Sequence, residues 1–296
     1  ASNHHNPPAL LRSPLAPMSV TAWQRAAAAT LLLASATATA EQKPLWELGF
    51  GVAPMVLPDY RGSDQSRSYF LPLPYIIYRG DVFRVERQGI FARLVDGRRM
   101  RFDLSFDAGP PVDSSKNAAR VDMPDLDAVF EVGPSLEICI WNECGARHVA
   151  QFRLPVRAVF STDFGSIDSQ GGTLFPHFNL DLRDIGPGGG WRFGASLGAL
   201  YATERYHDYY YEVLPAYATV TRPAYDADGG YSGARVAMTL SKRFRYVWVG
   251  GFIRYDNLSN TVFADSPLMR TDHSLQAGLA VAWVFAESDE WVESQD

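Results

Sequence analysis

Three segments of the chain alternate apolar and polar side chains over long stretches. In residues 150–160 the even positions are apolar, and the odd positions include Arg153 and Arg157. The same alternation runs through 191–201 and 275–285. A period of two predicts β-strands with two unlike faces. Each segment has about the 9–11 residues that cross a bilayer as a tilted strand, whereas a soluble strand more often has about 5 or 6.

The rest of the chain after residue 40 shows similar segments and no convincing helical repeat. Membrane-spanning strands need every backbone group paired, so they are stable only in a sheet that closes on itself. We therefore predict an all-β fold: a transmembrane, antiparallel up-and-down β-barrel of about twelve strands, with ten as the alternative count. The predicted strands are 46–57, 68–79, 81–95, 98–108, 127–139, 147–160, 173–183, 190–202, 209–214, 231–243, 245–257 and 273–286.

The two faces of these strands predict two different surroundings. The rows of Trp, Leu and Phe are expected to face lipid, and the rows that contain Arg153 and Gln276 a polar interior. Leu279 then faces lipid, while Gly278 faces the interior, where Ser should be tolerated. A soluble lipocalin-type barrel is the alternative, but it would bury the large apolar residues and use fewer strands. Aromatic residues near strand ends fit interfacial girdles: Trp46, Tyr78, Trp191, Tyr201, Tyr255 and Trp283.

The predicted connections are of two lengths, which is expected of a barrel with short turns on one rim and long loops on the other. The loop that contains Pro215, Pro223 and Tyr225 would either plug the barrel mouth or simply be stiffened by its prolines. The tight connections are 79–81 and 242–245, the long ones are 58–67, 215–230 and 258–272, and 109–126 and 161–172 are longer than the simplest barrel needs.

The first forty residues are excluded from the fold because they resemble an export signal. Arg25 is followed by an apolar stretch and by small residues that end at Ala40, as in a secretory signal peptide. Residues 1–17 precede a plausible start at Met18. The mature chain would begin at Glu41, with the barrel over 41–286 and an acidic tail over 287–296.

Composition excludes several classes of protein. The chain has 296 residues, of which 20% are charged, too many for a bundle of membrane helices. Its net charge of −6 is spread along the sequence, so nucleic acid is not an expected partner. The two cysteines, Cys139 and Cys144, are expected to form a disulfide in an exported protein. A metal site there would have too few ligands.

No pattern in the mature chain indicates catalysis, a metal or a cofactor. Its four histidines lie outside any nucleophile or HExxH motif. His177, Asn179 and Asp181 share one strand face, which could orient a base but is more simply an inward polar ladder. The aspartates of 122–127 and 226–228 lack EF-hand spacing. We therefore predict a protein that is not an enzyme.

Several short motifs follow one another along essentially the whole mature chain. They are W-E-L-G-F-G-V, P-D-Y-R-G-S-D, L-P-L-P-Y-I-I-Y-R-G-D-V-F, Y-Y-Y-E-V-L-P, R-P-A-Y-D-A, R-Y-D-N-L and D-S-P-L. They contain Tyr60, Gly62, Pro72, Pro74, Arg79, Gly80, Pro215, Pro223 and Tyr225. In this order the motifs resemble the MltA-interacting protein (MipA/OmpV) family.

The resemblance implies a Gram-negative outer-membrane barrel that is exported, embedded in outer-membrane lipid and inserted by the barrel-assembly machinery. One member is described as a scaffold between a lytic transglycosylase and a murein synthase; others are linked to adhesion, antibiotic response or solute passage. Many such barrels end on their last aromatic residue, whereas Phe285 is followed by the tail here. Phe285 would therefore be an internal assembly signal.

Two functions remain open: an interaction scaffold and a passive pore for small solutes. For a scaffold, the periplasmic rim would be the useful surface. With the first strand running outward from Trp46, that rim would include 79–81, 109–126 and 242–245. Lys242, Arg243 and Arg245 are the candidate contacts. Pro72 and Pro74 lack amide donors and are expected to break the ladder locally.

Overall fold

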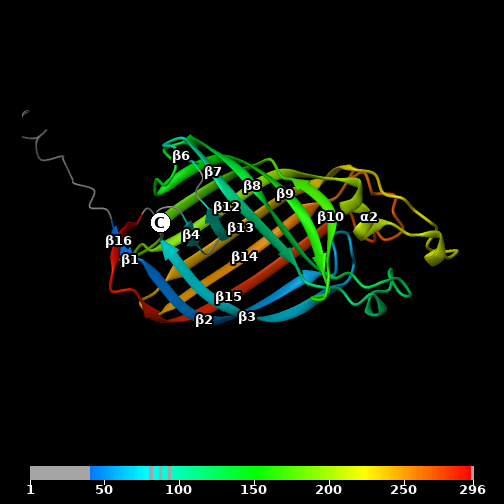
Figure 1. Ribbon diagram of the computed structural model, residues 1–296, viewed down its shortest axis with the longest axis horizontal. Coiled ribbons are helices and arrows are strands. Elements are labelled where there is room, and N and C mark those ends of the chain that lie inside the picture. Colours follow the sequence, from blue (N-terminus) through cyan, green and yellow to red (C-terminus); the bar gives the residue numbers. More distant parts are fainter. Residues whose placement is uncertain (1–40, 80–82, 87–88, 93–94, 295–296) are drawn as a thin grey trace, which may run out of the picture. The chain divides into compact units, whose positions relative to one another are not determined.

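A single large antiparallel sheet forms most of the part of the chain that the structure describes. The computed structural model describes residues 41–79, 83–86, 89–92 and 95–294. The sheet twists and curls around a central space (Figure 1). Its long strands are β2 (Trp46–Pro58), β3 (Ser66–Arg79), β7 (Met100–Gly109), β8 (Ala128–Trp141), β9 (His148–Thr162), β10 (Ile167–Leu174), β11 (His177–Ile185), β12 (Trp191–Ala202), β13 (Gly230–Arg243), β14 (Val247–Asn257) and β15 (His273–Glu287).

The strand order shows that the sheet is an up-and-down meander. From β3 it runs through β2, β15, β14, β13 and β12 to β10, β9, β8 and β7. Strand β11 pairs with the same two neighbours as β10, namely β9 and β12. Strands β10 and β11 therefore act as one strand interrupted at Phe175 and Pro176. The prediction of a large antiparallel sheet is confirmed.

The seam between β3 and β7 holds only short strands among the described residues. They are β4 (Phe83–Glu86), β5 (Gly89–Ala92) and β6 (Val95–Asp96). Strand β4 pairs with β3 and with β5, and β6 pairs with β7. The predicted long strand 81–95 is therefore wrong, because two short strands and a two-residue strand occupy the described parts of that segment.

The prolines of β3 lie beside this seam. Pro72 and Pro74 are in unbroken register with Val52 and Phe50 of β2, so the expected break in that ladder is wrong. On its other edge β3 pairs with β4 only at Tyr78 and Arg79, as far as the described residues show. An edge strand tolerates prolines because the missing donors cost no ladder hydrogen bond there.

The predicted strand 209–214 is also wrong. Residues Glu204–Tyr211 form a helix, α2, and only Val213 makes an isolated bridge, to Tyr225. Tyr206, His207 and Tyr211 are buried. Positions 206, 207, 210 and 211 fall on one side of a helix, so this helix buries a single aromatic face. The run of tyrosines has high strand propensity, but burial of that face outweighs it.

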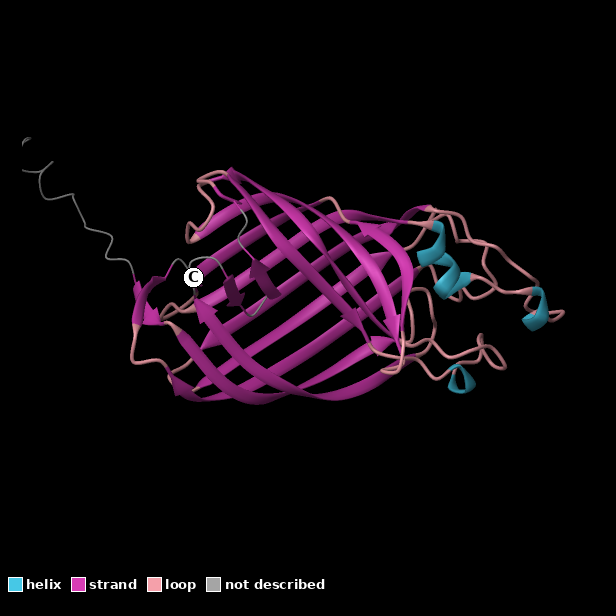
Figure 2. Ribbon diagram, in the orientation of Figure 1, coloured by secondary structure: helices cyan, strands magenta, loops and turns pink. Residues whose placement is uncertain are grey.

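The long connections gather at one end of the sheet and the short turns at the other (Figure 2). The loop end carries α2 and two short 3₁₀ helices, η1 (Ser114–Lys116) and η2 (Pro215–Tyr217). Since β7 ends at Gly109 and β8 begins at Ala128 at the loop end, the assignment of 109–126 to the same rim as 242–245 is wrong. The loop-end connections are 59–65, 110–127, 163–166, 203–229 and 258–272.

The first and last described strands meet at the turn end. Strand β1 (Glu41–Pro44) pairs with β16 (Trp291–Ser294), so part of the acidic tail belongs to a two-stranded sheet. Cys139 and Cys144 form a disulfide at the turn between β8 and β9, with a Cα–Cα distance of 5.5 Å. Among the described residues, no helix combines the length and apolar character needed to span a membrane.

Candidate functional site

The outward face of the sheet is apolar and exposed. Leu279 is 67% exposed, Phe70 is 70% exposed and Trp283 is 62% exposed. The inward positions of β15 alternate with them, since Ser274, Gly278 and Ala282 are buried. Water would not favour so much exposed apolar surface, whereas lipid does. The sheet therefore has the inside-out polarity of a membrane protein.

The interior of the curled sheet contains charged side chains in ion pairs. Arg235 Nε lies 2.6 Å from Asp256 Oδ1, and Arg192 Nη2 lies 2.9 Å from Asp181 Oδ2. Nearer the turn end, Arg79 Nη2 lies 2.6 Å from Glu47 Oε1. Charges in a low-dielectric interior need such partners because desolvation is costly. Each pair links side chains of two different strands. The pairs therefore hold these charged side chains in the interior.

A compact cap covers the loop end. Tyr60, Tyr211 and Phe263 are buried in it, and the rings of the last two stack with centroids 3.8 Å apart. The Tyr60 hydroxyl donates to the Leu268 carbonyl at 2.7 Å, and the Tyr211 hydroxyl to the Arg61 carbonyl at 2.8 Å. Burial raises the pKa of Tyr60 to about 12. The cap thus has a hydrophobic core of its own.

Polar contacts hold the long loop 110–127 in the cap. Asn117 Nδ2 donates to Asp59 Oδ2 at 2.7 Å, which ties this loop to the connection after β2. Arg120 Nη1 donates to the Tyr210 carbonyl at 3.1 Å, and Arg222 Nη1 to the Val121 carbonyl at 2.8 Å. These contacts join three connections that lie far apart in the sequence.

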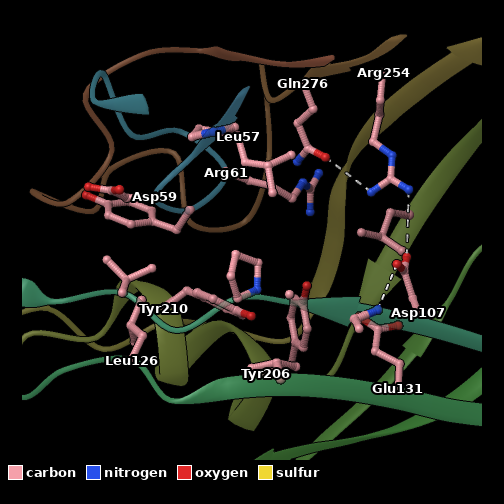
Figure 3. A pocket seen from close by; sticks show the side chains of 18 of the residues that line it. Leu57, Asp59, Arg61, Asp107, Leu126, Glu131, Tyr206, Tyr210, Arg254 and Gln276 are labelled. Carbon is pink, nitrogen blue, oxygen red and sulfur yellow. Dashed lines mark hydrogen bonds and ion pairs between the residues drawn. The ribbon is translucent and has the colours of Figure 1, made fainter. Parts of the chain in front are cut away.

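A cavity lies between the cap and the interior of the sheet (Figure 3). Its volume is about 900 Å³, including space open to solvent. Tyr206 and Tyr210 reach it from α2, while Arg254 and Gln276 reach it from β14 and β15. A second cavity of about 680 Å³ continues toward the middle of the sheet and shares Arg254 with the first.

A larger hollow of about 1710 Å³ opens at the turn end, and we call it the vestibule. Its lining contains seven basic residues against three acidic ones, Glu47, Asp184 and Glu287. Such an excess attracts acidic partners. The basic residues are Lys43, Arg79, Arg147, Arg183, Arg192, Arg243 and Arg245.

Comparison with family models identifies this architecture. The model described as MltA-interacting protein MipA matches residues 50–285. The chain belongs to the MipA family. No curated protein sequence matches it.

Comparison with solved structures gives only distant likenesses to this MipA-family protein. A bacterial polysaccharide outer membrane secretin has a TM-score of 0.37 at 9% identity, over 81% of this chain and 99% of the other. The Pseudomonas putida toluene transporter TodX has a TM-score of 0.23 at 12% identity, over 83% of this chain and 68% of the other. Scores this low support no conclusion.

Most of the MipA-family motif residues lie in the cap. Gly62 has a φ of +89°, and a Cβ there would overlap Met269 Sδ, so this turn needs glycine. Tyr225 pairs with Val213, and its hydroxyl donates to the Val262 carbonyl at 3.3 Å. Pro215 begins η2, and Pro223 lies in the same connection. Arg79 lies at the turn end, and Gly80 falls outside the described residues.

The three rim candidates differ in their accessibility. Lys242 Nζ donates to the Gly189 carbonyl at 2.8 Å, and Arg243 Nε donates to Glu47 Oε2 at 3.1 Å. Both side chains are therefore engaged in contacts within the chain, and of the two only Arg243 lines the vestibule. Arg245 is exposed, and its guanidinium lies 5.0 Å from the centre of the Tyr246 ring. Sequence reasoning did not place Arg147 or Arg183 here, because pairing across several strands brings them to this end.

His177 and Asp181, the residues that could have formed a catalytic base with its orienting carboxylate, make separate contacts. His177 Nδ1 lies 2.8 Å from the Phe175 carbonyl, whereas Asp181 binds Arg192 and Arg183. They form no His–carboxylate pair. Of the described residues, the group with metal-ligand geometry is Glu137, Cys139 and Cys144. Its two sulfur atoms are joined in the disulfide, so they are not available as thiolate ligands.

Proposed function

We propose that this MipA-family chain closes into an outer-membrane β-barrel, with the turn end in the periplasm and the cap outside. The apolar outward face and the polar interior support a lipid-embedded barrel. Short turns on one rim and long loops on the other match the usual orientation of such barrels. Strand β5 approaches β7, which supports closure across the β3–β7 seam. Export by the signal peptide in residues 1–40 is part of this proposal.

The barrel acts as a non-enzymatic scaffold that holds a periplasmic murein-processing enzyme at the outer membrane. The family is described by its interaction with MltA, and this description supports an enzyme partner of that kind. The basic vestibule is the observation that carries the proposal, because it offers an acidic partner a charged surface at the periplasmic end. A lytic transglycosylase and a murein synthase are the proposed partners.

Charge reversal at the exposed edge of the vestibule tests the scaffold. Arg245 and Arg147 are the best positions, because both are exposed and a reversal there leaves the buried pairs of the wall in place. The double variant Arg147→Glu and Arg245→Glu should weaken capture of murein-processing enzymes from a periplasmic extract at low salt, where exposed charges act most strongly. Arg205→Glu, exposed at the loop end, is the matched control. Equal capture by all three proteins would refute the vestibule as the contact surface.

The cavities inside the sheet favour one other function, a passive pore for small solutes. The packed cap opposes it, since its core and hydrogen bonds cross the mouth between several connections. Single-channel recording in a planar bilayer distinguishes the two functions. Silence supports the scaffold, and steady open-pore currents support the pore.

Insertion by the barrel-assembly machinery is proposed to use Phe285 as an internal signal. Phe285 is 57% exposed on the outward face near the turn end of β15. The next strand, β16, belongs to a separate two-stranded sheet, so β15 is the last long strand of the barrel. Its outward aromatic side chain therefore occupies the place that a terminal aromatic residue has in many outer-membrane proteins.

A further inference from the structure

The cavity beneath the cap is lined by both apolar and polar side chains. The apolar ones include Leu57, Leu126 and Val129. The polar ones include Tyr206 and Tyr210 of α2, Arg254 of β14 and Gln276 of β15. Its volume of about 900 Å³ includes space open to solvent, so a ligand can reach it from outside. A ligand that fills it needs both an apolar body and a polar head.

Two phenol hydroxyls face this cavity without a protein partner. Among the hydrogen bonds of the described residues, none uses the hydroxyl of Tyr206 or Tyr210. The other tyrosines of α2 differ, because Tyr209 donates to the Asp127 carbonyl and Tyr211 to the Arg61 carbonyl. In Figure 3 the Tyr206 ring lies between Tyr210 and Asp107 and points toward the arginine side of the cavity. Both hydroxyls are therefore available as donors.

Arg254 is the weakly paired cation of the site. Its Nη2 lies 4.0 Å from Asp107 Oδ2, and its Nη1 lies 3.5 Å from Gln276 Oε1, both at the outer limit of such contacts. Arg235 on the neighbouring strand lies 2.6 Å from Asp256. Arg254 lines both cavities, as do Asp107, Arg157 and Arg235.

Two acidic groups of the lining have close cationic partners. Glu131 Oε2 lies 3.2 Å from Arg157 Nη1 and accepts from the Thr173 hydroxyl at 2.8 Å. Asp59 lies 2.6 Å from Arg67. Asp107 is shared, at 3.7 Å from Arg157 and 4.0 Å from Arg254. At Arg254 an incoming anion therefore competes with two long contacts, those with Asp107 and Gln276.

We propose that this cavity is a binding site for small organic carboxylates with an apolar body. The carboxylate would accept charge-assisted hydrogen bonds from Arg254 and a further one from a phenol hydroxyl of α2, and the body would pack on the apolar side chains of the lining. Charge-assisted hydrogen bonds of this kind are stronger than neutral ones, and arginine suits planar carboxylates. The site is independent of the vestibule, so its success or failure leaves the scaffold proposal untouched.

Benzoate binding to the refolded full-length protein tests this site, with benzyl alcohol as the neutral probe of similar shape. Isothermal titration calorimetry should show saturable benzoate binding and much weaker binding of benzyl alcohol. Arg254→Gln should weaken benzoate binding by about tenfold or more, because it removes the charge-assisted contact. Arg192→Gln, an interior arginine that lines the vestibule, is the matched control and should bind benzoate as the wild type does.

The double variant Tyr206→Phe and Tyr210→Phe provides a second test that keeps every charge. It should also weaken benzoate binding, whereas heat-modifiable gel migration should remain. If Arg254→Gln fails to assemble, this double variant decides the question alone. The proposal is overturned if wild type does not bind benzoate, if benzyl alcohol binds as tightly, or if the assembled variants bind as wild type does. Loss of binding in Arg192→Gln alone would place benzoate in the vestibule instead, which also overturns it.

Discussion

Single residues in the interior are constrained by contacts that alternation does not reveal. Gly278 faces inward as the sequence indicates, but a Cβ there would lie 2.6 Å from Phe252 Cε1 and 2.9 Å from Met55 Cβ. These contacts argue against the expectation that Ser is tolerated at this position. The Phe252 ring occupies the space that a side chain would need, because Phe252 and Met55 are the register neighbours of Gly278 on the two adjacent strands.

Gly278→Ser should lower the yield of assembled barrel and its resistance to heat. Overpacking of this kind costs about 1–3 kcal/mol. Gly109→Ser is the matched control, because a Cβ at Gly109 meets nothing within 4 Å. Gel migration of unheated samples across a temperature series measures both variants. Identical midpoints would contradict the overpacking argument.

His207 gives the cap a dependence on pH. Its Nδ1 lies 2.6 Å from the Asp228 carbonyl, and its ring is buried beside Tyr211 and Phe263. Burial, followed by a smaller effect of Arg61, lowers the pKa of His207 to about 4. The unfolded chain would bind a proton near pH 6.5, and the folded cap only near pH 4. Cap stability is therefore complete above about pH 6.5 and falls as the pH decreases toward 4.

Loop-end proteolysis should consequently increase as the pH falls from 7 to 5, while the strands stay protected. His207→Gln should flatten this dependence, because its side chain does not titrate in that range. The cleavage rate is measured at each pH. It is divided by the rate at which the same protease cleaves an unstructured peptide at that pH, which removes the pH dependence of the protease itself. A profile in His207→Gln as steep as in the wild type would exclude His207 as its source.

At the scale of elements, each long strand separates a lipid face from an interior face. In β15 the residues from Leu275 to Phe285 at odd positions are exposed, and the even positions between them are largely buried. This alternation was readable from the sequence because side-chain direction in a strand is a local property. The helix α2 was missed, since its aromatic face gains partners only from distant strands and from the cap.

Leu279→Arg should impair insertion, because a charge on the lipid face near mid-strand costs about 2–4 kcal/mol. Leu279→Phe keeps that face apolar and should insert normally. Folding yield into lipid vesicles, read from the gel shift between heated and unheated samples, compares the two. Normal insertion of the arginine variant would mean that Leu279 does not face lipid.

At the scale of the whole molecule, the two ends of the sheet differ in chemistry. The loop end is a packed aromatic cap, and the turn end is a basic hollow beside the two-stranded sheet of β1 and β16. A barrel with this polarity would present the vestibule to periplasmic proteins and the cap to the exterior. Because the cap is packed and the turn end is hollow, solutes should pass the loop end less readily than the turn end.

The full-length protein should fractionate with the outer membrane and migrate differently before and after heating in detergent. A sheet whose backbone groups are paired resists detergent until heat separates the strands. Recovery of the protein as a soluble periplasmic species would contradict the membrane assignment. This measurement is independent of any partner or ligand.

The sequence by itself determined the β-class, the direction of most side chains and the family, because alternation and motif order are encoded over short stretches of chain. Tertiary structure decided which segments meet. Asn117 contacts Asp59 from 58 residues away, and Arg222 reaches the Ala119 carbonyl from 103 residues away. It also decided that 109–126 lies at the loop end, that the prolines of β3 lie beside the seam and that Arg254 lines two cavities. These contacts and positions depend on the order of the strands and on the curvature of the sheet. Neither can be predicted from a local sequence pattern.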